Sequence, residues 1–147
     1  MTERRSLIGP VIILLAFTAA VLAYDGWVSP GSSPVAWFHA QVPDAARAQF
    51  MAKIVEFSNT GLFSTKIRPL FADGKHFFAE LDRRDVMIEI MNPVYPPSDF
   101  QIWFYESGVR PADRAEIAQL AQRLRSELGD VTGSPSSNVR ELGRAQY

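Results

Sequence analysis

Glu80 and Glu89 are two carboxylates whose placement could support acid–base catalysis. Both belong to alternating patterns that predict neighbouring strands, so their side chains should share one face of a sheet. Carboxylates held close together repel each other and split their pKa values, which lets one act as a general acid and the other as a general base. The sequence offers no nucleophile or oxyanion-binding motif near them. Because carboxylates are common on exposed sheet faces, we expect no catalytic residues; a hydrolase using this pair is the alternative.

The two histidines, His39 and His76, do not form a metal-binding pattern. They lie far apart in the sequence, and the spacing of Asp73 and His76 matches no known metal motif. The chain has no cysteine, which excludes disulfides and thiolate ligands. Ser32 and Ser134 each follow a glycine but lie outside a Gly-x-Ser-x-Gly elbow. The sequence therefore predicts a solvated His76 in a turn, no metal and no cofactor.

The balance of charges argues against a nucleic-acid partner. The chain has 15 Lys and Arg residues and 16 Asp and Glu residues, which give a formal net charge of -1. This mixture provides no strong positive field to attract a phosphate backbone. The length of 147 residues leaves room for one small domain beside a hydrophobic amino-terminal run.

Residues 6–24 form that uncharged hydrophobic run. A helix needs roughly 20 apolar residues to cross a bilayer, and this run is about that long. The expected membrane-interface residues are Arg4 and Arg5 before the run and the aromatic Tyr24 and Trp27 at its end. Because basic flanks stay in the cytoplasm, the sequence predicts a single-pass anchor at residues 1–24 in a bacterial inner membrane. The amino terminus would be cytoplasmic and the carboxyl-terminal domain periplasmic or extracytoplasmic.

A cleaved signal peptide is the alternative for the same segment. Thr18 with Ala20, or Val21 with Ala23, has the small-residue spacing that a signal peptidase accepts. Cleavage would release a soluble protein, whereas the length of the run favours a retained anchor. We expect the anchor.

The remaining chain divides into a linker, a domain and a tail. Residues 25–43 are rich in Gly, Pro and Ser and predict a linker, although they contain an apolar segment at 35–38 that we expect to pack under the domain. Residues 44–128 carry periodic patterns and predict an extracytoplasmic domain. Residues 129–147 are polar and predict a flexible tail.

Two helices and four strands are predicted within residues 44–128. Asp44 should cap the first helix, which ends near Gly61, and Pro111 begins a closing helix that ends before Gly129. The strands are expected at residues 66–72, 75–81, 86–91 and 100–105. These elements predict an α+β, two-layer fold in which an antiparallel four-stranded meander is flanked by two helices. Pro69 marks the first strand as an edge strand.

The alternation within these strands separates a core face from an opposite face. The core face should hold Phe77, Ala79, Leu81, Val86, Ile88, Ile90, Phe100, Ile102 and Phe104. Besides the two glutamates, the opposite face should hold Phe78, Met87, Met91, Trp103 and Tyr105. These five side chains are unusually apolar for a surface that meets water, so we predict that they bind a partner. Alternatively, the Pro-rich loop 92–98, the linker around Trp37 and Phe38, or the tail covers this face.

Together these features predict a non-catalytic accessory subunit anchored in a membrane. Its transmembrane helix and apolar sheet face would bind and stabilise or assemble a larger integral membrane protein or complex. The expected partners are that complex and the lipid bilayer, and no nucleic acid. The alternative is a cleaved, secreted or periplasmic module that binds a small apolar or peptide ligand.

Overall fold

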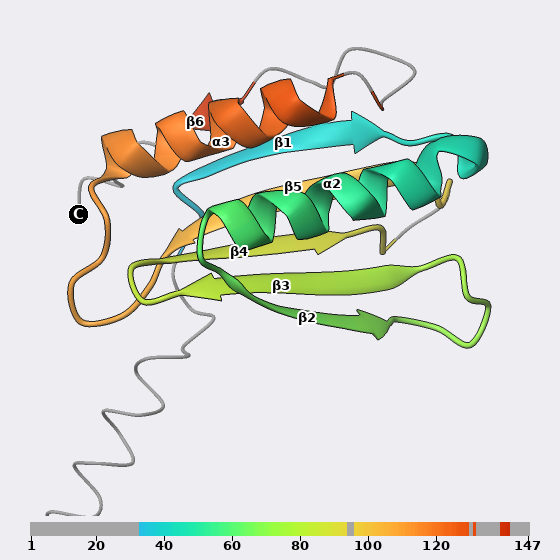
Figure 1. Cartoon of the computed structure of the whole chain (residues 1–147), viewed down its shortest axis with the longest axis horizontal. Coiled ribbons are helices and arrows are strands. Elements are labelled where there is room, and N and C mark those ends of the chain that lie inside the picture. The colour runs from blue at the N-terminus through green and yellow to red at the C-terminus, as the bar shows by residue number, and fades with distance from the viewer. Residues whose placement is uncertain (1–32, 94–95, 130, 132–138, 142–147) are drawn as a thin grey trace, which may run out of the picture. The chain divides into compact units, whose positions relative to one another are not determined.

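The computed structural model describes residues 33–93, 96–129, 131 and 139–141, which form an α+β domain. A six-stranded antiparallel sheet carries two helices on one face (Figure 1). The elements are β1 (Ala36–Gln41), the short 3-10 helix η1 (Asp44–Ala46), α2 (Arg47–Thr60), β2 (Ser64–Pro69), β3 (Phe77–Arg83), β4 (Val86–Met91), β5 (Asp99–Glu106), α3 (Arg114–Leu128) and β6 (Arg140–Glu141). The strand order is β2-β3-β4-β5-β1-β6.

The predicted α+β class is confirmed, and the four predicted strands are β2 to β5 of the sheet. They pair in sequence order as an antiparallel meander. Arg83 pairs with Val86, so the turn between β3 and β4 consists of Arg84 and Asp85. A turn at Arg83 and Arg84 would instead pair Leu81 with Val86, a register two residues away from the observed one. Because side chains alternate with a period of two, this shift leaves each residue on its predicted face.

The sheet has two strands more than expected. β1 lies within the predicted linker and pairs with β5 over six residues, and β6 lies within the predicted tail and pairs with β1. Ala36, Phe38 and Ala40 of β1 are fully buried. Two of these three are alanines, and Pro34 and Pro43 flank the strand. The short run therefore resembles a linker in composition although it alternates like a strand.

The helices and the sheet enclose one hydrophobic core. α2 contributes Phe50, Ile54 and Phe57 to it, and α3 contributes Ile117, Ala121, Leu124 and Leu128. The ring centroids of Phe50 and Phe100 lie 4.7 Å apart across the two layers. Among the described residues, neither helix combines the length and apolar character needed to cross a membrane. The predicted anchor, with Arg4, Arg5, Tyr24 and Trp27, lies outside the described residues.

The ends of the predicted helices are set by local polar contacts. Asp44 lies in η1, and its carboxylate pairs with Arg47 at 2.9 Å instead of capping the helix as expected. α3 begins with a capping box, in which the Asp113 amide donates to the Glu116 carboxylate.

His76, expected in solvent, is 2% exposed, and its Nδ1 lies 2.6 Å from Asp73 Oδ2. The turn that carries it therefore folds back onto the domain.

Buried Asn92 joins three segments at one end of the sheet. Its side chain accepts a hydrogen bond from the Phe77 amide at 2.8 Å and donates to the carbonyls of Lys75 and Pro97 at 2.8 and 2.7 Å. It thus links the start of β3 to the loop that leads into β5. Loss of the Asn92 side chain would leave these buried backbone groups without hydrogen-bond partners, which costs stability.

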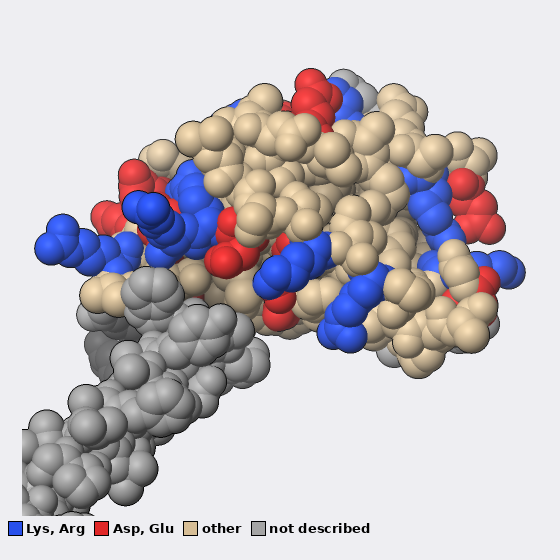
Figure 2. Space-filling model, turned by 60° about the horizontal axis from the view of Figure 1, so that its bottom comes forward, with Lys and Arg blue, Asp and Glu red and all other residues tan. Residues whose placement is uncertain are grey.

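β2 forms one edge of the sheet, next to β3. Figure 2 brings this edge forward and shows Lys and Arg side chains along it below a broad neutral surface. Pro69, the last residue of β2, agrees with the predicted edge position.

Gly108 and Gly74 provide a matched pair for testing how the β5–α3 loop holds the β3–β4 turn. Both have a positive φ, of 74° and 66°, which disfavours alanine by about 1 kcal/mol. A Cβ at Gly108 would also lie 1.9 Å from the Arg84 carbonyl oxygen, whereas one at Gly74 would meet no atom within 4 Å. We predict that Gly108→Ala costs about 1–3 kcal/mol more unfolding free energy than Gly74→Ala, measured by urea denaturation. Equal losses would show that the loop does not pack on the turn.

Candidate binding surface on the open sheet face

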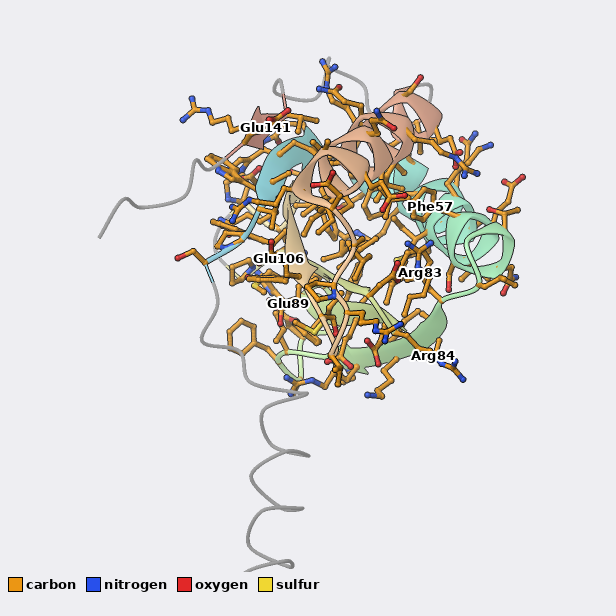
Figure 3. The ribbon with its side chains drawn as sticks, turned by 90° about the vertical axis from the view of Figure 1, so that its left-hand side faces the viewer. Phe57, Arg83, Arg84, Glu89, Glu106 and Glu141 are labelled. Carbon is orange, nitrogen blue, oxygen red and sulfur yellow. The ribbon has the colours of Figure 1, made fainter. Side chains whose placement is uncertain are left out.

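The open face is the side of the sheet turned away from α2 and α3. In the end-on view of Figure 3, Glu89 lies on this side, whereas Phe57 lies beneath the helices. All five predicted partner-binding residues lie here and are partly buried, namely Phe78, Met87, Met91, Trp103 and Tyr105. The structure therefore brings these side chains onto one continuous surface, as the alternation predicts.

Two stacked tryptophans form the centre of this face. Trp37 of β1 pairs with Trp103 of β5, and their rings are nearly parallel, with centroids 5.3 Å apart and an interplanar angle of 16°. His39 meets the Trp37 ring edge-on at 5.1 Å, and the Arg140 guanidinium lies over the same ring at 5.1 Å. A stacked aromatic pair contributes about 0.5–1.5 kcal/mol beyond its buried area. The centre of the surface is thus rigid.

Trp37 contributes to the open face as a strand residue and does not cover it. It was expected in a linker that could fold over the surface, but β1 lies in the plane of the sheet. Phe38, its neighbour, points the other way and is fully buried in the core. The other proposed covers involve residues 94–95 and most of the tail, which lie outside the described residues.

One row of side chains crosses all six strands of the open face. In order from β2 to β6 it consists of Lys66, Glu80, Glu89, Trp103, Trp37 and Arg140. Lys66 Nζ lies 2.8 Å from Glu80 Oε1 at one end of the row. A basic side chain therefore lies at each end of the row, and two carboxylates and two tryptophans lie between them.

Glu80 and Glu89 share the open face as predicted and are direct cross-strand neighbours. Burial raises the pKa of Glu89; a hydrogen bond from the Tyr105 hydroxyl opposes this rise, and the charge of Glu80 adds to it. Burial and the nearby Glu89 carboxylate raise the pKa of Tyr105 to about 12. Burial also raises the pKa of Asp82, with a further contribution from Glu80. Beside its tryptophans, the open face therefore holds carboxylates that are poorly solvated.

Three polar side chains, Gln41, His39 and Asp99, lie beside the tryptophans. Asp99 Oδ1 accepts a hydrogen bond from Gln41 Nε2 at 3.0 Å and lies 3.2 Å from His39 Nδ1. Within the described residues, no three His, Cys, Asp or Glu side chains converge as a metal site would require. The arrangement offers aromatic, thioether and carboxylate contacts on a rigid sheet, which suit binding.

Sequence reasoning missed three residues of this surface, Trp37, His39 and Arg140. The first two alternate with the buried Ala36 and Phe38, which is a strand pattern that could have identified β1. Arg140 belongs to a two-residue strand, which is too short to show a periodicity.

No protein-family model and no curated protein matches the sequence.

The raised pKa of Glu89 predicts a pH dependence of stability. Glu89 holds its proton more tightly in the folded chain than in the unfolded chain, whose glutamates titrate near pH 4.5. As pH rises above 4.5, the unfolded chain loses this proton first, so the free energy of unfolding falls until folded Glu89 is ionised as well. Glu89→Gln should reduce this decline in urea denaturation measured from acid to neutral pH.

Glu141→Gln, which changes an exposed carboxylate of β6, is the control and should retain the wild-type decline. Asp82, whose pKa is also raised, should supply the part that remains in Glu89→Gln. An unchanged decline in Glu89→Gln would show that its carboxylate is fully solvated.

Proposed function

We propose that this chain is a non-catalytic, membrane-anchored accessory subunit that uses the open face to bind a larger integral membrane protein or complex. The observation that carries this proposal is the stacked pair of Trp37 and Trp103, bordered by Met91 and Tyr105, on a face that neither helix covers. Aromatic residues and methionine are enriched at the centres of protein interfaces. Trp and Tyr also dominate the residues whose truncation weakens binding most.

The rigidity of the open face supports a role in binding. Its side chains are carried by paired strands, and the Trp37–Trp103 stack orders the two largest of them before any partner arrives. A surface ordered in advance loses less conformational entropy on association. The chain therefore offers a preformed surface for a partner of complementary shape.

Glu89 defines what the partner must supply. Its carboxylate is already poorly solvated, and an apolar partner would bury it further. Tyr105 supplies one donor, but burial of a carboxylate without enough hydrogen-bond partners is costly, so a stable complex needs a further donor opposite Glu89. We expect an Arg or Lys side chain, or backbone amides, at that position of the partner.

The hydrophobic residues 6–24 supply the proposed anchor. A retained anchor restricts the domain to the surface of one membrane and raises its effective concentration near a partner in that membrane. Arg4 and Arg5 favour a cytoplasmic amino terminus and a periplasmic or extracytoplasmic domain, in a bacterial inner membrane.

The alternative is a cleaved, secreted or periplasmic module that binds a small apolar or peptide ligand. A groove of about 630 Å³ between α2 and β2 favours it. Its lining consists of the apolar Met51, Ala52, Val55 and Ile67 and the polar Glu56, Asn59 and Thr60. The intact mass of the protein purified from native cells, from both the membrane and the soluble fraction, separates the two proposals. An uncleaved chain supports the anchored subunit, and a chain that begins near Val21 or Tyr24 supports the secreted module.

The double variant Met91→Lys/Trp103→Ala tests the proposed surface. It removes half of the tryptophan stack and places a charge beside it on the open face. We expect the wild-type chain, tagged and purified from native membranes in mild detergent, to retain a stoichiometric membrane protein. The double variant should lose it, because truncation of a central aromatic residue alone typically costs at least about 2 kcal/mol of binding.

A matched control is Gln49→Lys/Gln122→Ala, which makes the same kinds of change at exposed positions of α2 and α3. It should keep the partner. Circular dichroism and the thermal midpoint verify that both double variants are folded. If the folded open-face variant retained its partner as well as the control does, the open face would not be the binding surface.

A further inference from the structure

The α2–β2 groove lies on the helix side of the sheet, away from the open face. Met51, Ala52, Val55 and Ile67 form its apolar part, and Glu56, Asn59 and Thr60 complete its lining. Ile67 pairs with fully buried Ala79, so its side chain lies on the helix side of the sheet, yet it is 48% exposed. Val55 of α2 is 42% exposed across the groove. The core thus ends at β3, and β2 extends beyond the cover of the helices. Large aliphatic side chains on both walls of a groove mark a place for another apolar side chain.

The backbone of β2 can accept another strand beside this groove. Within the described residues β2 pairs with β3 alone. The Leu70 amide donates to the His76 carbonyl at 3.0 Å, so it points toward β3. In an antiparallel ladder every second residue points the same way, which directs the backbone N–H and C=O groups of Ile67 and Thr65 outward. Pro69, which has no amide hydrogen, limits the outer edge to a short stretch.

The two sides of this edge differ in chemistry. Ile67 faces the apolar groove, whereas its neighbours Lys66 and Arg68 lie on the other side of the sheet, beside Glu80 and Phe78. The Lys66 side chain is 73% exposed although it pairs with Glu80. Figure 2 shows basic side chains along this edge, with acidic side chains between them. A strand added here would therefore meet the apolar part of the groove on one side and the basic side chains of Lys66 and Arg68 on the other.

We propose that the outer edge of β2 and the α2–β2 groove bind an extended peptide segment of a partner protein, in which acidic residues flank an apolar one. The segment adds to the sheet as a further strand through the backbone groups of Ile67. Its apolar side chain, opposite Ile67, enters the groove beside Val55. The side chains before and after it point to the other side, where acidic groups meet Lys66 and Arg68.

Charge also favours an acidic peptide over a second copy of the same chain as the occupant of this site. An antiparallel pair of β2 strands centred on Ile67 would place Lys66 opposite Arg68 of the other copy. Like charges directly opposite each other destabilise a strand pair. The basic edge therefore favours an acidic partner over self-association. This site does not depend on the proposed role of the open face.

The test uses the full-length chain in detergent micelles and a fluorescent peptide in which glutamate and valine alternate. Binding is followed by fluorescence anisotropy, with a lysine–valine peptide of equal length as the charge control. We expect the acidic peptide to bind and the basic peptide not to bind. Val55→Glu should weaken binding by about tenfold or more, because it puts a charge into the apolar groove. Gln49→Glu, which adds the same charge elsewhere on α2, should change it less than about twofold.

Two further measurements identify the mode of binding. Hydrogen exchange should show that the peptide protects the Ile67 amide, while Lys66→Glu/Arg68→Glu should reverse the preference between the acidic and basic peptides. The open-face variant Met91→Lys/Trp103→Ala should bind the peptide as the wild type does, which keeps this test separate from that of the proposed function. Absence of binding at about 1 mM peptide, or binding without protection of Ile67, would overturn the proposal. A concentration-dependent dimer that Ile67→Asp dissociates would overturn it in favour of self-pairing.

Discussion

The pairing of β1 with β5 is the constraint on which both faces of the sheet depend. Six consecutive residues pair in register, and they alternate between the core and the open face. Phe38 thereby packs under the helices at 6.2 Å from the Phe104 ring, while Trp37 stacks on Trp103. A slip of one residue would exchange these roles and place a tryptophan in the core. One backbone ladder therefore determines the shape of the core and the composition of the proposed binding surface.

The open face joins this fixed aromatic centre to carboxylates that water solvates poorly. Glu80 and Glu89 lie directly opposite each other, and Tyr105 donates its hydroxyl to Glu89. Such a surface discriminates between partners, because a partner without a matching donor would bury a charge at a cost of several kcal/mol. The tryptophans favour association in general, whereas the carboxylates restrict it to complementary partners. The groove beside β2 lies on the helix side of the sheet, and of the residues in the proposed peptide site only Lys66 and Arg68 lie on the open-face side, at its β2 edge.

Much of the fold follows from periodicity in the sequence. Residues 86–91 alternate so clearly that β4 has the predicted bounds, and the core face of β3, β4 and β5 agrees with the prediction. β1 was missed because two of its three buried residues are alanines, which carry little hydrophobic signal in a Pro-bounded segment. His76 was placed in solvent because a turn sequence alone does not reveal the contact with Asp73 that accompanies its burial.

The candidate site was predictable only where strands follow one another in the chain. Phe78, Met87, Met91, Trp103 and Tyr105 share a face because a meander connects their strands. Trp37 joins them through a pairing of residues far apart in sequence, and local patterns do not specify such pairings. The same reason hides the α2–β2 groove, whose walls come from a helix and an edge strand that meet only in the folded domain.

Site-specific photocrosslinking in native membranes tests the central claim most directly. A photoreactive residue at Met87 lies on the open face, and one at Gln122 lies on the exposed side of α3. We predict one discrete adduct with a membrane protein from Met87, lost when Trp103→Ala is added, and none from Gln122. An adduct from Gln122 with none from Met87 would contradict a partner-binding role of the open face.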